Sequence, residues 1–265
     1  MGPEFTLIAG PCVIESESLC LRVAAHLAEL REQLKIQVVF KASFDKANRT
    51  SGSSFRGPGL DQGLRVLERV RQASGLPVLT DVHEGHQAEP VAEVVDVLQV
   101  PAFLCRQTDL VQSCGSAAKK HARTVNVKKG QFLAASDMAA VRDKLVQAGA
   151  ASIWFTERGT SFGYHDLVVD FRNLPRLREL GCPVILDATH AVQQPGALGG
   201  SSGGQPDFIE PLAAAGAAVG INGLFLEVHP EPKRGLSDAT TMLPLERLRP
   251  LIQRVLRIRE VINAA

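Results

Sequence analysis

Short apolar runs alternate along the chain with longer segments in which apolar residues recur every three or four positions. The short runs have the length of buried strands, and the longer segments have the spacing of helices with one buried face. The pattern predicts eight strands, at residues 5–9, 37–40, 77–80, 97–100, 124–127, 152–156, 183–186 and 218–226. It predicts eight helices, from Ser16 or Ser18 to 34 and then at 60–73, 87–94, 110–121, 137–148, 174–180, 208–215 and 245–261.

Eight strand–helix units in 265 residues match the size and rhythm of an α/β fold, the closed (β/α)8 or TIM barrel. A doubly wound open sheet is the alternative, but no GxGxxG motif follows the first predicted strand. We expect one catalytic barrel domain over residues 1–265, because neither a linker nor an internal repeat beyond this rhythm interrupts the chain. Residues 1–4 are expected to be a disordered N-terminus or an expression-tag remnant.

Composition and charge exclude several classes of partner. The formal net charge is +1, so bulk attraction to nucleic acid or to a membrane surface is not expected. No apolar run approaches the ~20 residues that span a bilayer, and the N-terminus lacks a signal-peptide pattern. The five cysteines are odd in number and have no CxxC spacing, which is typical of reduced thiols. We therefore expect a cytoplasmic protein with neither nucleic-acid nor membrane partners.

Polar residues follow nearly every predicted strand. They are Cys12, Lys41, Asp81, His83, Gln99, Lys128, Arg158, Asp187, His190 and Glu227. In a barrel the carboxyl ends of the strands meet on one face, where the active sites of barrel enzymes lie. The glycine-rich stretch at residues 196–204 is expected to be a mobile loop over that face.

Five cations are expected to share this face. They are Lys41, Lys46, Arg49, Lys128 and Arg158, with Lys129 and Arg56 as lesser candidates. Arginine and lysine bind phosphate well where they meet in a partly desolvated cleft. The alternative is ordinary solvated surface charge. Lys128 and Lys129 are neighbours, so only one of them enters the site if the strand continues through both.

Four further residues offer the ligand types of a divalent metal ion. They are Cys12, His190, Glu227 and Asp238, from three strand ends that are adjacent in a closed barrel and from one loop. Thiolate, imidazole and carboxylate suit Zn²⁺, Fe²⁺ or Mn²⁺. Taken singly, a cysteine is more often a small buried apolar residue and a histidine more often structural. His229 competes as a ligand, because it lies two residues after Glu227.

Asp81 and His83 are candidates for acid–base catalysis or for orienting a water molecule, with Glu84 beside them. The alternative is that they support the site by hydrogen bonding without touching substrate. Glu157 and Asp187 are expected to orient neighbouring cations rather than to react.

Several blocks of the sequence carry a family resemblance. They are IAGPCVIES, FKASFDKANRTS, PAFLCRQTDL, VNVKKGQ, TERG, FGY, DATH, HPEP and LSDA. Together they resemble the 3-deoxy-D-manno-octulosonate 8-phosphate synthases, also named 2-dehydro-3-deoxyphosphooctonate aldolases, from about residue 5 to 261. The resemblance implies a (β/α)8 homotetramer that condenses phosphoenolpyruvate with D-arabinose 5-phosphate and water. This transferase reaction releases phosphate and serves lipopolysaccharide inner-core sugar biosynthesis.

The resemblance also implies a division of labour among the residues. Phosphoenolpyruvate would be held by Lys41, Lys46, Lys128 and Arg158, with Gln99 and the backbone near Ala102 assisting. The pentose phosphate would be held by Asn48, Arg49 and Thr50, and by Arg106 of the chain itself or of a neighbouring subunit. The sister enzyme, 3-deoxy-D-arabino-heptulosonate 7-phosphate synthase, typically has Lys-Pro-Arg-Thr where this chain has Lys-Ala-Asn-Arg. It is one alternative, and a non-catalytic sugar-phosphate-binding barrel is the other.

The family has a metal-independent class with asparagine at the position of Cys12 and a metal-dependent class with cysteine there. By this likeness Cys12, His190, Glu227 and Asp238 hold a divalent ion, which is Zn, Fe, Mn, Co or Cd. The chain departs from the family at Met242, at Ala135-Ser136 and in the loop at residues 199–206. These departures bear on the loop, metal access and subunit contacts.

Overall fold

The computed structural model describes residues 5–48, 52, 54–197 and 203–264. Eight parallel strands form the central sheet: β1 (Thr6–Gly10), β2 (Gln37–Lys41), β3 (Val78–Asp81), β4 (Val97–Val100), β5 (Thr124–Lys128), β6 (Ser152–Glu157), β9 (Val184–Asp187) and β12 (Gly223–His229). β1 pairs in parallel with both β2 and β12, which closes the sheet into a barrel. The predicted (β/α)8 fold is confirmed, and the open-sheet alternative is wrong.

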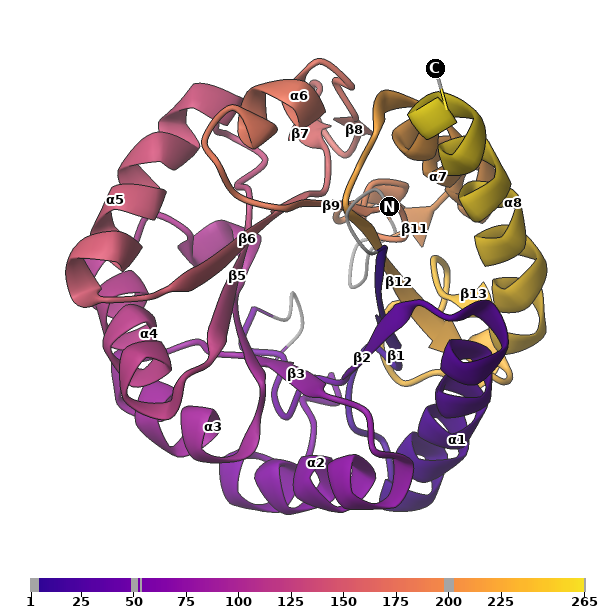
Figure 1. Cartoon of the computed structure of the whole chain (residues 1–265). Coiled ribbons are helices and arrows are strands. Elements are labelled where there is room, and N and C mark those ends of the chain that lie inside the picture. Colours follow the sequence, from indigo (N-terminus) through magenta and orange to yellow (C-terminus); the bar gives the residue numbers. More distant parts are fainter. Residues whose placement is uncertain (1–4, 49–51, 53, 198–202, 265) are drawn as a thin grey trace.

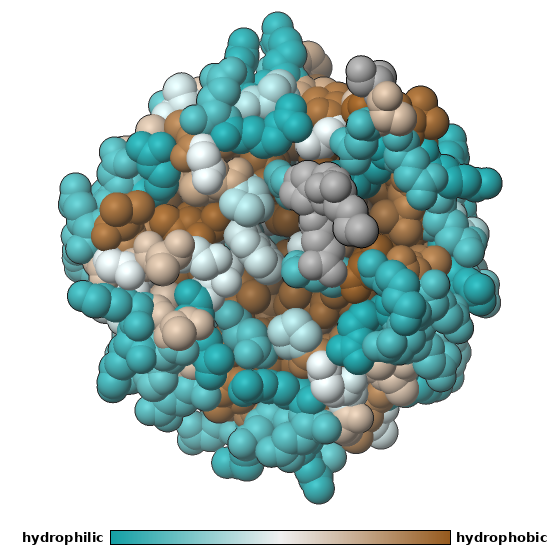
Figure 2. All heavy atoms as spheres, in the orientation of Figure 1, coloured by the Kyte–Doolittle hydropathy of each residue, from teal (hydrophilic) through white to brown (hydrophobic). Residues whose placement is uncertain are grey.

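In the described part of the chain, eight helices form a ring around the strands (Figure 1). They are α1 (Glu17–Leu34), α2 (Leu60–Ser74), α3 (Ala88–Val94), α4 (Thr108–His121), α5 (Met138–Ala148), α6 (Asn173–Arg178), α7 (Ile209–Val219) and α8 (Leu245–Ala264). α1 begins where the Ser16 side chain accepts a hydrogen bond from the Leu19 amide at 3.2 Å. On the face shown in Figure 2, hydrophilic residues cover the outer ring and hydrophobic residues gather nearer the centre. None of the helices in the described ranges is long and apolar enough to cross a membrane.

The eighth strand begins later than the sequence pattern predicts. Residues 218 and 219 belong to α7, and the strand runs from Gly223 to His229. The alanine-rich stretch before them favours a helix, and Gly220 ends this helix in the left-handed conformation, with φ 87°. The strand also ends later than predicted, at His229, so Glu227 lies inside the strand rather than after it.

The structure contains several short elements that the sequence pattern does not predict. Three short pairings form: β7 (Thr160–Ser161) with β8 (Leu167–Val168), β10 (Gln193–Gln194) with β11 (Gly203–Gly204), and β13 (Leu243–Pro244) with β12. The single-turn helices are η1 (Gly85–Gln87), η2 (Ala102–Leu104), η3 (Ala135–Asp137), η4 (Pro206–Phe208) and η5 (Pro232–Arg234). The loop expected to be mobile at residues 196–204 lies in part outside the described residues.

Inside the barrel, an apolar layer supports a polar one. The apolar layer comprises Ile8, Val39, Leu79, Val97, Ile185 and Phe225, with Trp154 packed against it. Side chains alternate along a strand, so the residue two positions later points into the same interior, closer to the carboxyl end. Those later residues are polar on five of these strands: Lys41, Asp81, Gln99, Asp187 and Glu227. The alternation thus delivers a ring of charged and amide side chains to one end of the barrel.

Candidate active site

The carboxyl ends of the strands and the loops that follow them enclose a cavity of about 540 Å³. Its lining includes most of the residues singled out from the sequence: Lys41, Lys46, Asn48, Asp81, His83, Gln99, Ala102, Lys128, Arg158, His190 and Asp238. A cavity with convergent polar groups at this end of a barrel is the expected location of an active site.

Other predicted site residues lie elsewhere. Arg49 and Thr50 fall outside the described residues. Arg106 is exposed just before α4 and does not line the cavity of its own chain. Cys12 and Glu227 are fully buried directly behind the cavity wall, in contact with residues that line it.

Lys41 and Lys46 face the carboxylate of Glu227. The Lys41 Nζ atom donates to Glu227 Oε1 at 2.7 Å and to the Cys12 carbonyl oxygen at 2.8 Å, and Lys46 Nζ lies 4.0 Å from the same Oε1. Burial opposes ionisation of Glu227, but Lys41, His190 and Lys46 together outweigh burial and hold the pKa of Glu227 well below its usual range. Burial likewise opposes the charge on Lys46, yet Cys12 and Glu227 raise the pKa of Lys46 above its usual value. Both groups are therefore charged near neutral pH.

Lys128 is held between a carboxylate and an aromatic ring. Its Nζ atom donates to Asp187 Oδ2 at 2.5 Å and lies 3.6 Å from the centroid of the Phe225 ring. Asp187 therefore orients a neighbouring cation, as the sequence predicts. Burial lowers the pKa of Lys128, and Asp187 opposes this shift. The aromatic ring stabilises the ammonium group of the lysine through a cation–π interaction. The N–H groups that point away from the ring and from Asp187 stay available to a ligand.

Arg158 presents an unsatisfied donor. Its Nη2 atom donates to Gln193 Oε1 at 2.8 Å, whereas Nη1 is buried and has no hydrogen-bond partner among the described residues. A buried guanidinium nitrogen without an acceptor is costly unless a ligand supplies one. Because Arg158 lines the cavity, an anion bound there would be that acceptor.

Lys129 points to the opposite side of the strand from Lys128 and is excluded from the cavity. It is fully buried, donates to the Gly130 and Leu133 carbonyl oxygens at 3.1 Å each, and lies 3.6 Å from Glu157 Oε2. Glu157 Oε1 accepts hydrogen bonds from the backbone amides of Arg158 and Gly159. Lys129 and Glu157 thus hold the backbone that carries Arg158.

Asp81 is a fixed hydrogen-bond acceptor. It accepts from the Ser43 hydroxyl and, at 2.6 Å, from Gln99 Nε2. Burial raises its pKa, but Lys41 and Lys46, together with His83 and Lys128, outweigh burial and hold the pKa of Asp81 well below its usual range. A carboxylate with so low a proton affinity is poorly suited to take up a proton, so its geometry favours an orienting role.

His83 is better suited than Asp81 to accept a proton. Burial lowers the pKa of its imidazole, which keeps the ring neutral near pH 7. Its ring packs edge-on against Phe44 at 5.7 Å, and its buried Nδ1 atom has no hydrogen-bond partner among the described residues. A neutral imidazole at the edge of the cavity can accept a hydrogen bond or a proton from water.

Three of the four candidate metal ligands form one cluster, since ligand atoms of Cys12, Glu227 and Asp238 all lie within 4.8 Å of one another, and His190 lies beside two of them. Cys12 Sγ lies 3.3 Å from Asp238 Oδ2, and His190 Nε2 lies 3.6 Å from Glu227 Oε1 and 3.7 Å from Asp238 Oδ2. Donor atoms bound to one ion at the usual ~2.0–2.3 Å are about 3 to 4 Å apart, so these separations fit a shared cation. Glu227 Oε2 is buried without a hydrogen-bond partner among the described residues, and a cation would satisfy it. The donor set and its spacing therefore fit a divalent ion.

Binding of such an ion would change the protonation state of the Cys12 thiol. Burial, with the nearby Asp238 and Glu227, raises the pKa of its thiol far above the usual value. A bound cation reverses this effect, because thiolate is the form that coordinates metal. The Ser237 hydroxyl lies 2.8 Å from the sulfur and fixes its position.

The competing ligand His229 does not join this set. Its Nδ1 atom accepts a hydrogen bond from the Glu231 amide at 2.9 Å, and its Nε2 atom lies 3.8 Å from Glu15. Glu15 in turn accepts a hydrogen bond from the Leu236 amide at 2.9 Å. His229 and Glu15 therefore brace the loop that leads to Asp238.

Charges around the cavity balance one another within the described residues. Four cations, Lys41, Lys46, Lys128 and Arg158, face four carboxylates, Asp81, Asp187, Glu227 and Asp238. A site that binds a strongly anionic substrate needs an excess of positive charge. A divalent cation on the Cys12 set would supply that excess.

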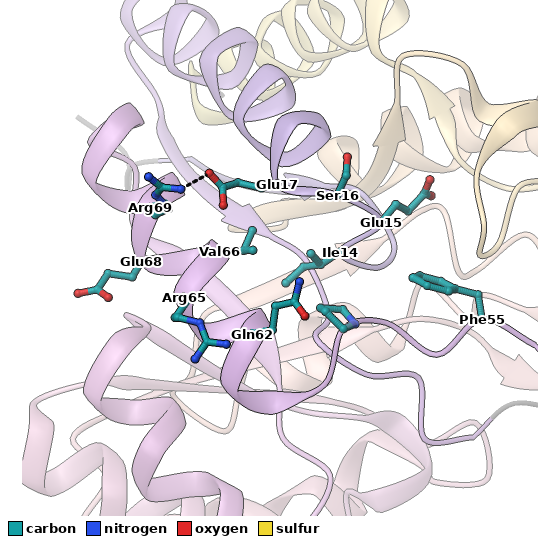
Figure 3. A pocket seen from close by; sticks show the side chains of 11 residues that line it. Ile14, Glu15, Ser16, Glu17, Phe55, Gln62, Arg65, Val66, Glu68 and Arg69 are labelled. Atoms are coloured by element: carbon teal, nitrogen blue, oxygen red, sulfur yellow. Dashed lines mark hydrogen bonds and ion pairs between the residues drawn. The ribbon is translucent and has the colours of Figure 1, made fainter.

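A second hollow, of about 740 Å³, lies between the start of α1 and the outer face of α2 (Figure 3). Arg69 pairs there with Glu17 at 2.7 Å, and Glu15, Arg65 and Glu68 add charges of both signs. Arg65, Glu68 and Arg69 are exposed, and the described lining gathers neither buried cations nor a set of metal ligands. The smaller cavity inside the barrel is therefore the better candidate for an active site.

Some residues of the cavity were not anticipated from the sequence. Gln131 and Gln193 line it, and Ser43 and Ser237 fix Asp81 and Cys12. Ser43 and Ser237 lie in the blocks FKASFDKANRTS and LSDA, but nothing in these blocks indicated a role for either serine. Gln193 follows His190 by three residues, and this spacing after a strand end was the one available signal.

Comparison with known proteins agrees with this geometry. A model of the DAHP synthetase I family matches residues 1–261. A Synechococcus protein is 57% identical over 261 residues, which cover 98% of this chain and 90% of the relative. A Cyanothece protein is 57% identical, with coverages of 97% and 93%, and one from Syntrophotalea carbinolica is 54% identical, with 97% and 91%. All three are named 2-dehydro-3-deoxyphosphooctonate aldolase. The resemblance drawn from the sequence blocks is thereby confirmed, and the chain belongs to the DAHP synthetase I family.

Proposed function

We propose that this protein condenses phosphoenolpyruvate with D-arabinose 5-phosphate and water to give 3-deoxy-D-manno-octulosonate 8-phosphate and phosphate. The relatives' shared name supports the product, and the cavity supports the chemistry. The observation that carries most weight is the set of buried cations, one of which, Arg158, has a nitrogen without an acceptor. We further propose that the enzyme acts in the cytoplasm in lipopolysaccharide inner-core sugar biosynthesis. Its five cysteines, all of them free, are consistent with that compartment.

Phosphoenolpyruvate would lie over Lys128 and Arg158. Its phosphate and carboxylate are the acceptors that Arg158 Nη1 lacks, and the ammonium of Lys128 faces the same space. Lys46 and the amide of Gln99 complete the lining on the other side. Fixed cations in a partly desolvated cavity let two anionic substrates approach each other, which is the main obstacle to this condensation.

The pentose phosphate would enter over Ala47 and Asn48, which line the cavity next to Lys46. Arg49 and Thr50, which follow in the chain, are proposed to hold its phosphate group. Ala47 and Asn48 stand where the sister enzyme, which uses a four-carbon aldose phosphate, typically has proline. This segment is therefore the proposed determinant of aldose length.

In the proposed reaction, C3 of phosphoenolpyruvate forms a bond to the aldehyde carbon of the pentose, and the aldehyde oxygen takes up a proton to become a hydroxyl group. Water adds at C2 and loses a proton, and phosphate then leaves by cleavage of the C–O bond as the C2 carbonyl forms. His83 is the proposed acceptor of the proton or hydrogen bond from water, because its neutral ring offers an unpartnered Nδ1 atom. Asp81 and Gln99 would orient the groups around it.

Cys12, His190, Glu227 and Asp238 are proposed to hold a divalent ion, and the choice among Zn, Fe, Mn, Co and Cd is left to experiment. Such an ion can polarise the aldehyde oxygen or orient the attacking water. Lys41 forms an ion pair with Glu227. Its positive charge keeps this carboxylate ionised, and its hydrogen bond holds it in place.

A phosphate-release assay tests the function directly. We expect phosphate to appear at the rate at which phosphoenolpyruvate disappears when arabinose 5-phosphate is present. With erythrose 4-phosphate the value of kcat/KM should be about 100-fold lower, the discrimination typical of a pocket that distinguishes substrates by size. Phosphoenolpyruvate labelled with ¹⁸O at the bridging position should give labelled phosphate, because the C–O bond breaks.

Other results would contradict the proposal in distinct ways. A preference for erythrose 4-phosphate would identify the seven-carbon sister reaction. Binding of both substrates without phosphate release would identify a non-catalytic sugar-phosphate-binding barrel. Label retained in the keto acid would refute C–O cleavage.

We also propose that the enzyme is a homotetramer. Large aromatic side chains are exposed on the loops after three consecutive barrel strands: Phe103 (54% exposed), Phe132 (55%), Phe162 (69%) and Tyr164 (95%). Arg106, which does not reach its own cavity, lies beside Phe103. Exposed apolar patches of this kind are typical of interfaces, and a second copy placed there could bring its own Arg106 to the site.

Sedimentation velocity tests the assembly. We expect the protein to sediment as a tetramer, and the double variant Phe103→Asp/Phe132→Asp to dissociate, because buried charge at an interface is costly. Phe208→Asp is a matched control, since Phe208 is similarly exposed, at 53%, but lies before α7 on another side of the ring. A monomeric parent protein would refute the proposal.

A further inference from the structure

A row of hydrogen-bonded polar side chains crosses four adjacent strands inside the barrel. The Thr156 hydroxyl donates to Asn126 Oδ1 at 2.8 Å, and Asn126 Nδ2 donates to Gln99 Oε1 at 2.8 Å. Gln99 Nε2 then donates to Asp81 Oδ1 at 2.6 Å. The row thus runs from β6 through β5 and β4 to β3, and each of its four members is at most 7% exposed.

The position of this row in the barrel makes its polarity costly. The row borders the apolar layer beneath the charged ring, which has Val97, Ile185 and Phe225 among its members. Asn126 lies two residues before Lys128 and Thr156 two before Arg158, so both occupy inward positions next to that layer. Buried amides and hydroxyls stabilise a fold less than apolar side chains unless every group is paired. Their presence therefore calls for a function beyond packing.

The direction of the row is set at one end. Asp81 is a carboxylate that only accepts hydrogen bonds, so Gln99 must turn its amide nitrogen toward it. The carbonyl oxygen of Gln99 then faces Asn126, so Asn126 must donate its amide N–H to it. Asn126 in turn presents its oxygen to Thr156, whose hydroxyl must donate. Each side chain has a single orientation that satisfies its neighbours.

We propose that Asn126 and Thr156 are positioning residues that fix the amide of Gln99, so that the cavity meets its N–H rather than its carbonyl oxygen. Gln99 Nε2 carries a second hydrogen, and no described residue accepts it. An anionic substrate such as phosphoenolpyruvate is attracted by an N–H and repelled by a carbonyl oxygen. This inference rests on the proposed function, since it assigns Asn126 and Thr156 a part in holding that substrate.

The variant Thr156→Val tests the proposal, because valine has the shape of threonine but cannot donate. Without the hydroxyl, Asn126 Oδ1 loses its partner, so Asn126 can rotate and Gln99 is held from the Asp81 side alone. We expect kcat/KM for phosphoenolpyruvate to fall about tenfold through a higher KM, in line with the loss of one buried hydrogen bond. The KM for arabinose 5-phosphate should stay as in the parent enzyme. Thr156→Ser, which restores the donor, should recover most of the loss.

A matched control lies on the same two strands. The Thr124 hydroxyl donates to Ser152 Oγ at 3.0 Å, joining β5 to β6 at the end away from the cavity. Thr124→Val removes an equivalent hydrogen bond and should leave the KM for phosphoenolpyruvate unchanged. If it raises this KM as much as Thr156→Val does, a general loosening of the strands is responsible and the proposal is wrong.

A double-mutant cycle shows whether Thr156 acts through Gln99. In a Gln99→Ala background, Thr156→Val should raise the KM no further, whereas additive effects would overturn the proposal. Thr156→Ala provides the same comparison should the valine variant fail to fold. Phosphate release by the parent enzyme is measured first. Its absence would refute the proposed function, whereas an active parent with an unchanged Thr156→Val variant would refute only this inference.

Discussion

Removing divalent metal with a chelator should lower the activity by at least about 100-fold, and Zn²⁺, Mn²⁺, Fe²⁺ or Co²⁺ should restore it. The reason is structural: ligand atoms of Cys12, Glu227 and Asp238 lie within 4.8 Å of one another, and His190 lies beside Glu227 and Asp238. One buried oxygen of Glu227 also lacks a hydrogen-bond partner among the described residues. A bound cation that stabilises charge in the transition state typically contributes several kcal/mol. The measurement is the phosphate-release rate before and after chelation, with the metal content of each sample determined. Full activity of a demonstrably metal-free enzyme would contradict the prediction.

Cys12→Asn separates the ion from the rest of the site. We expect this variant to keep partial activity that responds neither to chelator nor to added metal, because asparagine cannot act as a thiolate ligand. Its metal content should fall well below that of the parent, and chelator should no longer lower its Tm, since bound metal stabilises only the folded state. Cys20→Ala is the matched control. Cys20 is an equally buried thiol on α1, and its loss should leave metal content unchanged.

Replacing Arg158 should have an effect of similar or larger size. Arg158→Met is expected to lower kcat/KM for phosphoenolpyruvate by about 10³-fold, because a preorganised donor to developing charge is lost in a water-poor cavity. Arg158→Lys should recover only part of this loss, since lysine keeps the charge but cannot donate to Gln193 and to substrate in a fixed fork. Steady-state kinetics with each substrate varied in turn provide the measurement.

Arg172→Met is the control for Arg158→Met. Arg172 is an exposed arginine that pairs with Asp170 at 2.8 Å, near the start of α6 and away from the cavity lining. It should leave kcat/KM unchanged, because an exposed ion pair contributes little. An Arg158→Met enzyme with parental kinetics would show that Nη1 meets no substrate anion.

The sequence by itself determined the fold and much of the cavity. The alternation of apolar runs and helical segments is a local property, so it predicted eight strand–helix units before any contact was known. The period of two along each strand then placed Lys41 above Val39 and Asp81 above Leu79, facing the interior. Because parallel strands of a closed barrel end on one face, residues far apart in sequence were expected together there.

Local sequence signals failed where a competing local preference or a distant partner decided the outcome. The alanines before Gly220 favoured extending α7, so the eighth strand began at Gly223, later than expected. Only the register of β5 decided that Lys128 enters the cavity while Lys129 binds Glu157 behind it. Ser43 lies in the block FKASFDKANRTS, but nothing in that block indicates its hydrogen bond to Asp81 on a neighbouring strand.

Tertiary structure also decided the chemistry of the ionisable groups. The sequence shows cations, but only the fold shows that Lys41 and Lys128 are each paired with a buried carboxylate. The direction of the Thr156–Asn126–Gln99 row likewise depends on Asp81, whose charge is set by Lys41 and Lys46. Pairing and pKa depend on distance and burial, which are properties of the folded chain, whereas periodicity is written in the order of the residues. The barrel and its polar face were therefore readable in advance, while the charge state and orientation of its side chains became known only from the three-dimensional arrangement.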